Sequence, residues 1–121
     1  AVGLMTAGLC ELLKQAVGRP RPGMLITAVV PRAASSGYGF PSGHSAMVVF
    51  LCFVLWPSVP PRLRWLLPAA AGLVFLSRVY MGVHAPLDIV GGAALGCLTS
   101  LIFNKTWSPK KSRLAASRAK A

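Results

Sequence analysis

Long apolar segments, separated from one another by prolines, glycines and cations, constrain the fold of this chain more than any other feature. Four of them can be read, over about residues 1–17, 43–56, 65–81 and 86–103. Most are a little shorter than the roughly 20 residues with which a helix crosses a bilayer. None alternates with the period of two that a membrane-spanning strand requires. The sequence therefore predicts an all-α fold, a polytopic transmembrane bundle in which about four helices can be recognised.

The composition agrees with a membrane protein. Hydrophobic residues make up 55% of the chain and charged residues only 12%, whereas about a quarter of the residues of a soluble domain are charged. The formal net charge is +11, and such a basic balance can indicate nucleic-acid binding. Here the cations fall between apolar runs, which is the usual membrane pattern. We therefore expect the bilayer, and no nucleic acid, as a partner.

Neither cysteines nor carboxylates form a metal-ligand pattern. Cys10, Cys52 and Cys97 lie singly inside apolar runs, where a cysteine packs as a small hydrophobic residue. We predict no metal and no cofactor.

Gly92 and Gly96 form a small-xxx-small face on the fourth segment, which permits close helix approach.

The chain divides into a membrane part and a basic end. We expect a transmembrane domain over residues 1–104, and over residues 105–121 a polar, basic tail that is disordered. Residue 1 already lies inside an apolar run and is not methionine. The expectation is therefore that earlier helices of a longer membrane protein precede this segment.

The distribution of cations predicts the orientation. Four helices place the 57–64 loop and the tail on one side, which carries eight cations: Arg62, Arg64, Lys105, Lys110, Lys111, Arg113, Arg118 and Lys120. The other side carries five: Lys14, Arg19, Arg21, Arg32 and Arg78. By the positive-inside rule the first side, with the tail, is cytoplasmic. The five outer cations then need another explanation.

Further polar residues lie at this outer level. Ser42, Gly43 and His44 begin the second segment, and His84 and Asp88 begin the fourth. Guanidinium and ammonium groups bind phosphate oxygens, and the free amides of a helix N-terminus form an anion site. A carboxylate four residues from a histidine shares its helix face and can stabilise its imidazolium form. These residues together indicate a phosphate site with an activated histidine.

Each residue also has a structural interpretation when it is taken alone. Lys14, Arg21 and Arg78 could be helix-end cations whose heads reach the interface. His84 could be a helix cap, and Asp88 a first-turn acid favoured by the helix dipole. Glu11 we interpret as a packing or salt-bridge residue. These readings leave unexplained why both histidines and Asp88 lie at the same face as the excess cations.

Three stretches in this order resemble a known family. In "KQAVGRPRP" six residues separate Lys14 from Arg21-Pro22, "PSGH" covers Pro41 to His44, and in "SRVYMGVHAPLD" five residues separate Arg78 from His84, with Asp88 four further on. This pattern is similar to the three-part signature of the type 2 phosphatidic acid phosphatase superfamily. The resemblance covers about residues 10–100 and is closest to bacterial membrane members. Membrane members usually have six helices.

The resemblance implies a role for each residue. His84 attacks phosphorus and becomes a phosphohistidine, Asp88 orients His84, and His44 protonates the leaving group and then activates water. Phosphate is held by Lys14, Arg21, Arg78, Ser42 and the amide of Gly43, without a metal. The nearly apolar helices favour a lipid phosphate as substrate, since soluble members would need polar helix faces.

The substrate and reaction have alternatives. We expect a polyprenyl diphosphate of the undecaprenyl type first, then phosphatidic acid or phosphatidylglycerol phosphate. Phosphotransfer to an acceptor other than water is a further possibility. A non-catalytic lipid-phosphate binder or transporter subunit is another, although binding alone would not need two histidines. The resemblance to bacterial members suggests the bacterial plasma membrane, and the count of cations places the site on the extracytoplasmic face.

Overall fold

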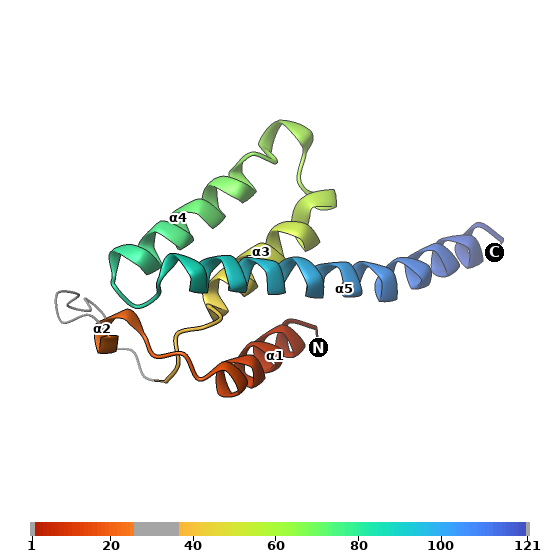
Figure 1. The fold of residues 1–121 in the computed structure, drawn as a ribbon. Coiled ribbons are helices and arrows are strands. Elements are labelled where there is room, and N and C mark those ends of the chain that lie inside the picture. Colours follow the sequence, from red (N-terminus) through yellow and green to blue (C-terminus); the bar gives the residue numbers. More distant parts are fainter. Residues whose placement is uncertain (1, 26–36, 121) are drawn as a thin grey trace.

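The computed structural model describes residues 2–25 and 37–120, and every regular element in these ranges is helical (Figure 1). The long helices are α1 (Val2–Val17), α3 (Gly43–Leu55), α4 (Leu66–Tyr80) and α5 (Pro86–Lys120). The short elements are α2 (Pro22–Leu25) and the 3-10 turns η1 (Trp56–Ser58) and η2 (Pro61–Leu63). The four predicted helices are confirmed. The short helix α2 was not predicted, because the prolines and glycines in and around it are typical of a turn. Arg32, one of the five outer cations, lies outside the described residues.

A glycine ends α1. Gly18 has a φ of 60°, and its amide donates to the carbonyl oxygen of Lys14 at 2.9 Å. This is the left-handed termination that favours glycine after the last helical residue. Lys14 therefore lies in the last turn of α1, and Arg19 and Arg21 lie in the non-helical segment that follows it.

The helix pair α3 and α5 forms the centre of the fold, and α1 packs against both (Figure 1). A Cβ at Gly92 would overlap the carbonyl oxygen of Ser42, and one at Gly96 would overlap that of Ala46. Only glycine permits so close an approach, so the predicted small-residue face on α5 is confirmed as the surface that receives α3. Cys10, Ala46 and Leu95 form the buried cluster where α1, α3 and α5 meet.

The described helices expose much apolar surface. α4 packs mainly on α3, and Leu73 and Leu76 on it are 70% and 67% exposed. Within the described residues, two helical stretches are long and apolar enough to cross a membrane, Pro61–Tyr80 and Pro86–Trp107. The stretch Gly43–Ser58 is apolar but shorter. Apolar side chains on the outside of a bundle are what lipid contact requires, and they agree with the predicted membrane fold.

The basic end of the chain corrects one expectation. We expected a disordered tail from residue 105, but α5 continues through it to Lys120 and is 35 residues long, or about 50 Å at 1.5 Å per residue. The end is rich in Ala, Lys and Arg, which are strong helix formers. A helix already held by packing needs no new nucleation to extend, although Pro109 lacks the amide that would donate within this stretch. The polarity of this stretch is compatible with an exposed helix, so it was not sufficient reason to expect disorder.

Candidate active site

The predicted phosphate-site residues converge at the end of the bundle where α1 and α4 end and α3 and α5 begin. The amide of Ser42, before α3, donates to the carbonyl oxygen of Asp88 in the first turn of α5 at 2.9 Å. Arg21, from the segment after α1, donates from Nη1 to the carbonyl oxygen of Val83, next to His84, at 2.9 Å. His44 lies within electrostatic reach of Arg78, Lys14 and Arg21. Side chains from four separate segments therefore share one site.

His84 lies between a carboxylate and a guanidinium group. Its Nδ1 is 3.7 Å from Oδ2 of Asp88, and its Nε2 is 3.5 Å from Nη1 of Arg21. The histidine is 5% exposed and the aspartate 1%. Within the described parts of the chain, Nδ1 has no hydrogen-bond partner. A small movement of either side chain would close the Nδ1–Oδ2 distance to a hydrogen bond, and catalytic hydrogen bonds are often long before substrate binds.

Burial and charge set the protonation of His84. Burial lowers its pKa, and the Arg21 guanidinium lowers it further, while the Asp88 carboxylate and the backbone of Gly39 offset only part of this effect. Since an unperturbed histidine already has a pKa of about 6.5, this environment favours the neutral form of His84. If the proton of the neutral ring lies on Nδ1, facing Asp88, the Nε2 lone pair is directed toward Arg21 and is available for attack.

Asp88 has two further partners. Its Oδ2 accepts the amide of Ala85 at 2.8 Å, so that the side chain caps the start of α5. Its Oδ1 accepts from Nη1 of Arg19 at 3.1 Å, an ion pair between residues 69 positions apart. Sequence reasoning placed Arg19 at this face but gave it no role. The available signal was that a buried acid in so basic a chain needs a cation, but spacing alone does not choose which one.

The predicted phosphate-binding cations differ in their contacts. Lys14 is paired with Glu11 at 3.3 Å, so the salt-bridge interpretation of Glu11 is confirmed. Nε of Arg78 is buried and has no hydrogen-bond partner among the residues that the structure describes. A buried guanidinium N–H without a partner is costly, and an anion at this site would satisfy it.

Of the backbone amides at the start of α3, one forms a structural hydrogen bond and the others remain available to the site. Ser42 is fully buried and caps the helix, because its hydroxyl oxygen accepts from the Ser45 amide at 3.4 Å. Its own amide is used by Asp88. Gly43 and His44 occupy the first helical turn, whose amides have no intrahelical acceptor. In this geometry the amides of Gly43 and His44 are better placed than that of Ser42 to serve an anion.

The family of the chain follows from a comparison with known proteins. A family model described as "PAP2 superfamily" matches residues 1–112. The chain belongs to the PAP2 superfamily. The name abbreviates type 2 phosphatidic acid phosphatase, so the family expected from the three motifs is confirmed.

Two of the curated relatives carry the names of lipid-phosphate enzymes. Lipid A 1-phosphatase of Rhizobium johnstonii is 39% identical over 103 residues, which cover 78% of this chain and 40% of that protein. Undecaprenyl-diphosphatase of Sulfolobus acidocaldarius is 42% identical over 66 residues, covering 54% and 32%. The chain thus spans well under half the length of these relatives.

Solved PAP2 structures share the fold. Aquifex aeolicus LpxE superposes with a TM-score of 0.76 at 28% identity, over 86% of this chain and 64% of that one. A transmembrane PAP2-type phosphatidylglycerolphosphate phosphatase from Bacillus subtilis superposes with a TM-score of 0.70 at 30% identity, over 90% and 56%. The predicted all-α transmembrane bundle is confirmed, and the protein is an integral membrane protein.

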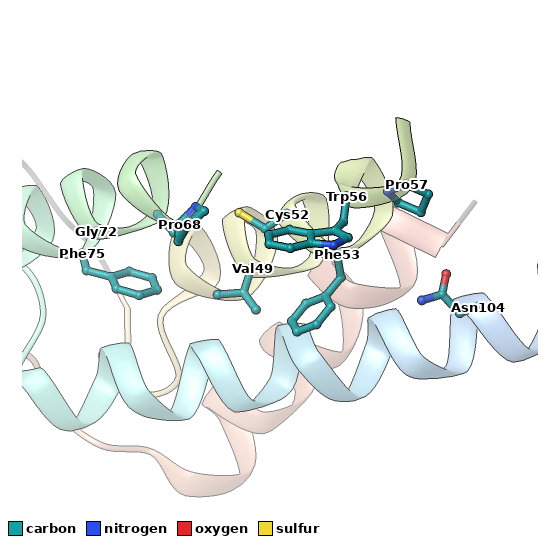
Figure 2. Close-up of a pocket in the computed structure, with 10 residues that line it drawn as sticks. Val49, Cys52, Phe53, Trp56, Pro57, Pro68, Gly72, Phe75 and Asn104 are labelled. Carbon is teal, nitrogen blue, oxygen red and sulfur yellow. The ribbon is translucent and has the colours of Figure 1, made fainter. Parts of the chain in front are cut away.

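A separate apolar groove of about 620 Å³ lies between α3, α4 and α5 (Figure 2). Val49, Phe53, Trp56 and Phe75 line it, and Asn104 is at its edge. Its lining begins at Val49 on α3 and continues to Trp56 at the start of η1, whereas His44 is in the first turn of α3. The groove therefore lies toward the opposite end of the PAP2 bundle from the paired histidine and aspartate. Among the described residues, no three His, Cys, Asp or Glu side chains gather as a metal site would require.

Proposed function

We propose that this chain carries the catalytic centre of a membrane lipid phosphatase that works through a phosphohistidine. The observation that carries the proposal is the position of His84, buried between the Asp88 carboxylate and the Arg21 guanidinium. A nucleophilic histidine needs a carboxylate on one ring nitrogen and its electrophile at the other. A phosphate bound by Arg21 would be held at Nε2.

In the proposed first step, Nε2 of His84 attacks phosphorus and the bond to the leaving oxygen breaks. His44 gives its proton to that oxygen, so the lipid leaves as an alcohol, or as a monophosphate when the substrate is a diphosphate. Asp88 stabilises the positive charge that develops on the His84 ring. In the second step His44 takes a proton from water, the water oxygen bonds to phosphorus, and the bond to Nε2 breaks. Inorganic phosphate leaves, and both histidines return to their starting states.

The charge of the transferred phosphoryl group would be met by Arg21, Arg78, Lys14 and the first amides of α3. The buried Nε of Arg78 without a partner supports its place in this set. Preorganised donors of this kind stabilise charge that develops in the transition state. Lys14 would exchange its contact with Glu11 for the phosphate, which is feasible because exposed ion pairs contribute little.

For the substrate we propose a lipid phosphate or diphosphate, with a polyprenyl diphosphate as the first compound to test. The membrane fold supports a lipid tail, and one relative is named an undecaprenyl-diphosphatase. Relatives named lipid A 1-phosphatase and phosphatidylglycerophosphatase B make lipid A 1-phosphate and phosphatidylglycerol phosphate the second group. We further propose that the site faces the extracytoplasmic side and that the end of α5 is cytoplasmic, as the excess of Lys and Arg around that end suggests.

The test is phosphate release from these lipids by the purified protein in detergent with EDTA present. We expect turnover that persists in EDTA and that His84→Ala lowers by several orders of magnitude. Labelled substrate should leave an acid-labile phosphoryl group on the protein, and mass spectrometry of the products should show free phosphate. Binding without turnover would favour a lipid-phosphate binder, and a phosphorylated acceptor would favour phosphotransfer. Full activity in His84→Ala would refute the proposed mechanism.

A further inference from the structure

The ion pair between Arg19 and Asp88 is the least expected contact of the site. Asp88 is 1% exposed, and a carboxylate so deeply buried requires a cation or several hydrogen bonds. Arg19 provides the cation from the segment after α1, with Nη1 3.1 Å from Oδ1. The backbone of Arg19 is fixed as well, since its carbonyl oxygen accepts the Gly39 amide at 2.8 Å. Gly39 in turn is so close to Asp88 that a Cβ there would lie 3.1 Å from Oδ2.

The two carboxylate oxygens of Asp88 have different partners. Oδ1 is bound by Arg19, whereas Oδ2 accepts the Ala85 amide at 2.8 Å and faces Nδ1 of His84 at 3.7 Å. Two anchors on opposite oxygens prevent rotation of the carboxylate about its Cβ–Cγ bond. The oxygen left facing the imidazole is therefore determined by the bond on the other oxygen.

Arg19 and Arg21, the two arginines of "GRPR", lie on opposite sides of His84. Arg21 lies beside Nε2, the nitrogen at which phosphate would be attacked. Arg19 lies behind Asp88 and reaches the histidine only through that carboxylate. Given the proposed function, on which this step rests, we propose that Arg19 is a positioning residue. It holds Asp88 in the orientation that serves His84, and it is not a ligand of the phosphate.

This arrangement has an electrostatic consequence. The charges that act on His84 come from Lys14 of α1, from Arg21 after it and from Asp88 of α5, and the charge of Arg19 partly neutralises Asp88. If Arg19 is made neutral, the full negative charge of Asp88 acts on the imidazole and favours its protonated form. Protonated His84 cannot attack, so the acid limb of the rate profile should move toward higher pH.

The experiment compares Arg19→Met and Arg19→Lys with wild type, using the purified protein in detergent and whichever of the lipids named above the wild type hydrolyses fastest. Arg62→Met is the matched control, since Arg62 lies in η2 between α3 and α4, at the far end of the bundle from the site. We expect Arg19→Met to lower kcat roughly 10- to 100-fold, the scale of a small misplacement in an active site. KM and competitive inhibition by inorganic phosphate should remain near the wild-type values. Arg19→Lys should recover most of the rate, because one donor suffices for the bond to Oδ1.

Distinct results would overturn the assignment. A raised KM and weaker inhibition by phosphate at unchanged kcat would make Arg19 a phosphate ligand. Full activity of Arg19→Met, or a loss that Lys does not rescue and that leaves the pH profile unmoved, would reduce the pair to a structural one. If Arg19→Met does not fold, Arg19→Gln replaces it as the uncharged variant. A wild type that releases no phosphate from any lipid would refute the proposed function itself, whereas an active wild type with an indifferent Arg19→Met refutes only the positioning role.

Discussion

The amide of Ser42 and the carbonyl oxygen of Asp88 form a 2.9 Å hydrogen bond that joins the start of α3 to the first turn of α5. His44 lies two residues after the donor, and His84 lies four residues before the acceptor. The bond therefore fixes the two histidines relative to each other. Gly92, one turn after Asp88, makes this contact possible, because any side chain there would overlap the carbonyl oxygen of Ser42.

Gly92→Ala should separate α3 from α5 and impair both stability and catalysis. Its Cβ would also lie 2.9 Å from Cβ of Ser45, and overpacking of this kind costs about 1–3 kcal/mol. Thermal unfolding in detergent and phosphate release are the measurements. Gly72→Ala, in α4 with nothing within 4 Å of the new Cβ, is the matched control and should be neutral or slightly stabilising. Equal behaviour of the two variants would contradict close α3–α5 packing.

The acid limb of kcat/KM should have its midpoint below the ordinary histidine pKa of about 6.5. Burial and Arg21 lower the pKa of His84, so the neutral nucleophile persists into mildly acidic solution. The pH profile should be measured with two substrates whose phosphate groups have different pKa values. A midpoint that belongs to the enzyme is the same for both, whereas one that belongs to the substrate differs between them. The same lowered pKa makes folding stability depend on pH. As the pH falls below about 6.5, the unfolded chain binds a proton at His84 before the folded protein does, so the free energy of unfolding decreases until the folded-state pKa is passed; above pH 6.5 the titration of His84 has no effect. A common midpoint above pH 7 for both substrates would contradict a buried, neutral His84.

The two histidines should respond differently to the leaving group. His44→Ala should lose much of its first-step rate with a lipid phosphate, whose alkoxide leaving group needs a proton, and much less with an aryl phosphate, which leaves without one. Since hydrolysis also needs His44, aryl phosphate should give a burst and a stable phosphoprotein. His84→Ala should give neither. A burst from His84→Ala would mean that the nucleophile has been assigned wrongly.

The sequence predicted the helices well, and it predicted which helix ends meet, for a clear physical reason. Apolar runs bounded by breakers define membrane helices, and their alternating direction brings the ends of α1 and α4 to the starts of α3 and α5. Lys14, His44 and His84 could therefore be assigned to one face without coordinates. Spacing also predicted that Asp88 faces His84, but as neighbours on one helix; α5 begins at Pro86, so His84 lies just before the helix, and its ring is still 3.7 Å from the Asp88 carboxylate.

The remaining features depend on contacts between segments that spacing does not encode. Arg19 and Arg21 are both available to the site, and only the path of the chain after Gly18 decides which one meets Asp88. The use of the Ser42 amide by Asp88 results from how closely α3 approaches α5. The continuation of α5 depends on helix propensity, which polarity alone does not reveal.

Gly39→Ala should reduce turnover more than stability. The new Cβ would lie 3.1 Å from Oδ2 of Asp88 and 3.4 Å from the carbonyl oxygen of Pro20, so the carboxylate facing His84 must shift. A displacement of a few tenths of an ångström is readily absorbed by the fold but matters for proton transfer, and we expect roughly a tenfold loss of kcat. Gly8→Ala, in α1 with nothing within 4 Å of its Cβ, is the matched control. A fall in the unfolding temperature without loss of kcat would contradict this account.

Deletion of residues 108–120 tests whether the end of α5 is helical. A helical end contributes to the ellipticity at 222 nm, so the molar signal of the whole protein should fall on deletion, whereas removal of a disordered tail would leave it unchanged. Phosphate release should be preserved, because residue 108 lies twenty positions after Asp88, about 30 Å along the helix axis. The measurement is far-UV circular dichroism at matched molar concentration, with activity assayed on the same samples. An unchanged molar ellipticity would show that the helix ends near Trp107, while a loss of turnover would mean that this end supports the catalytic face across the length of α5.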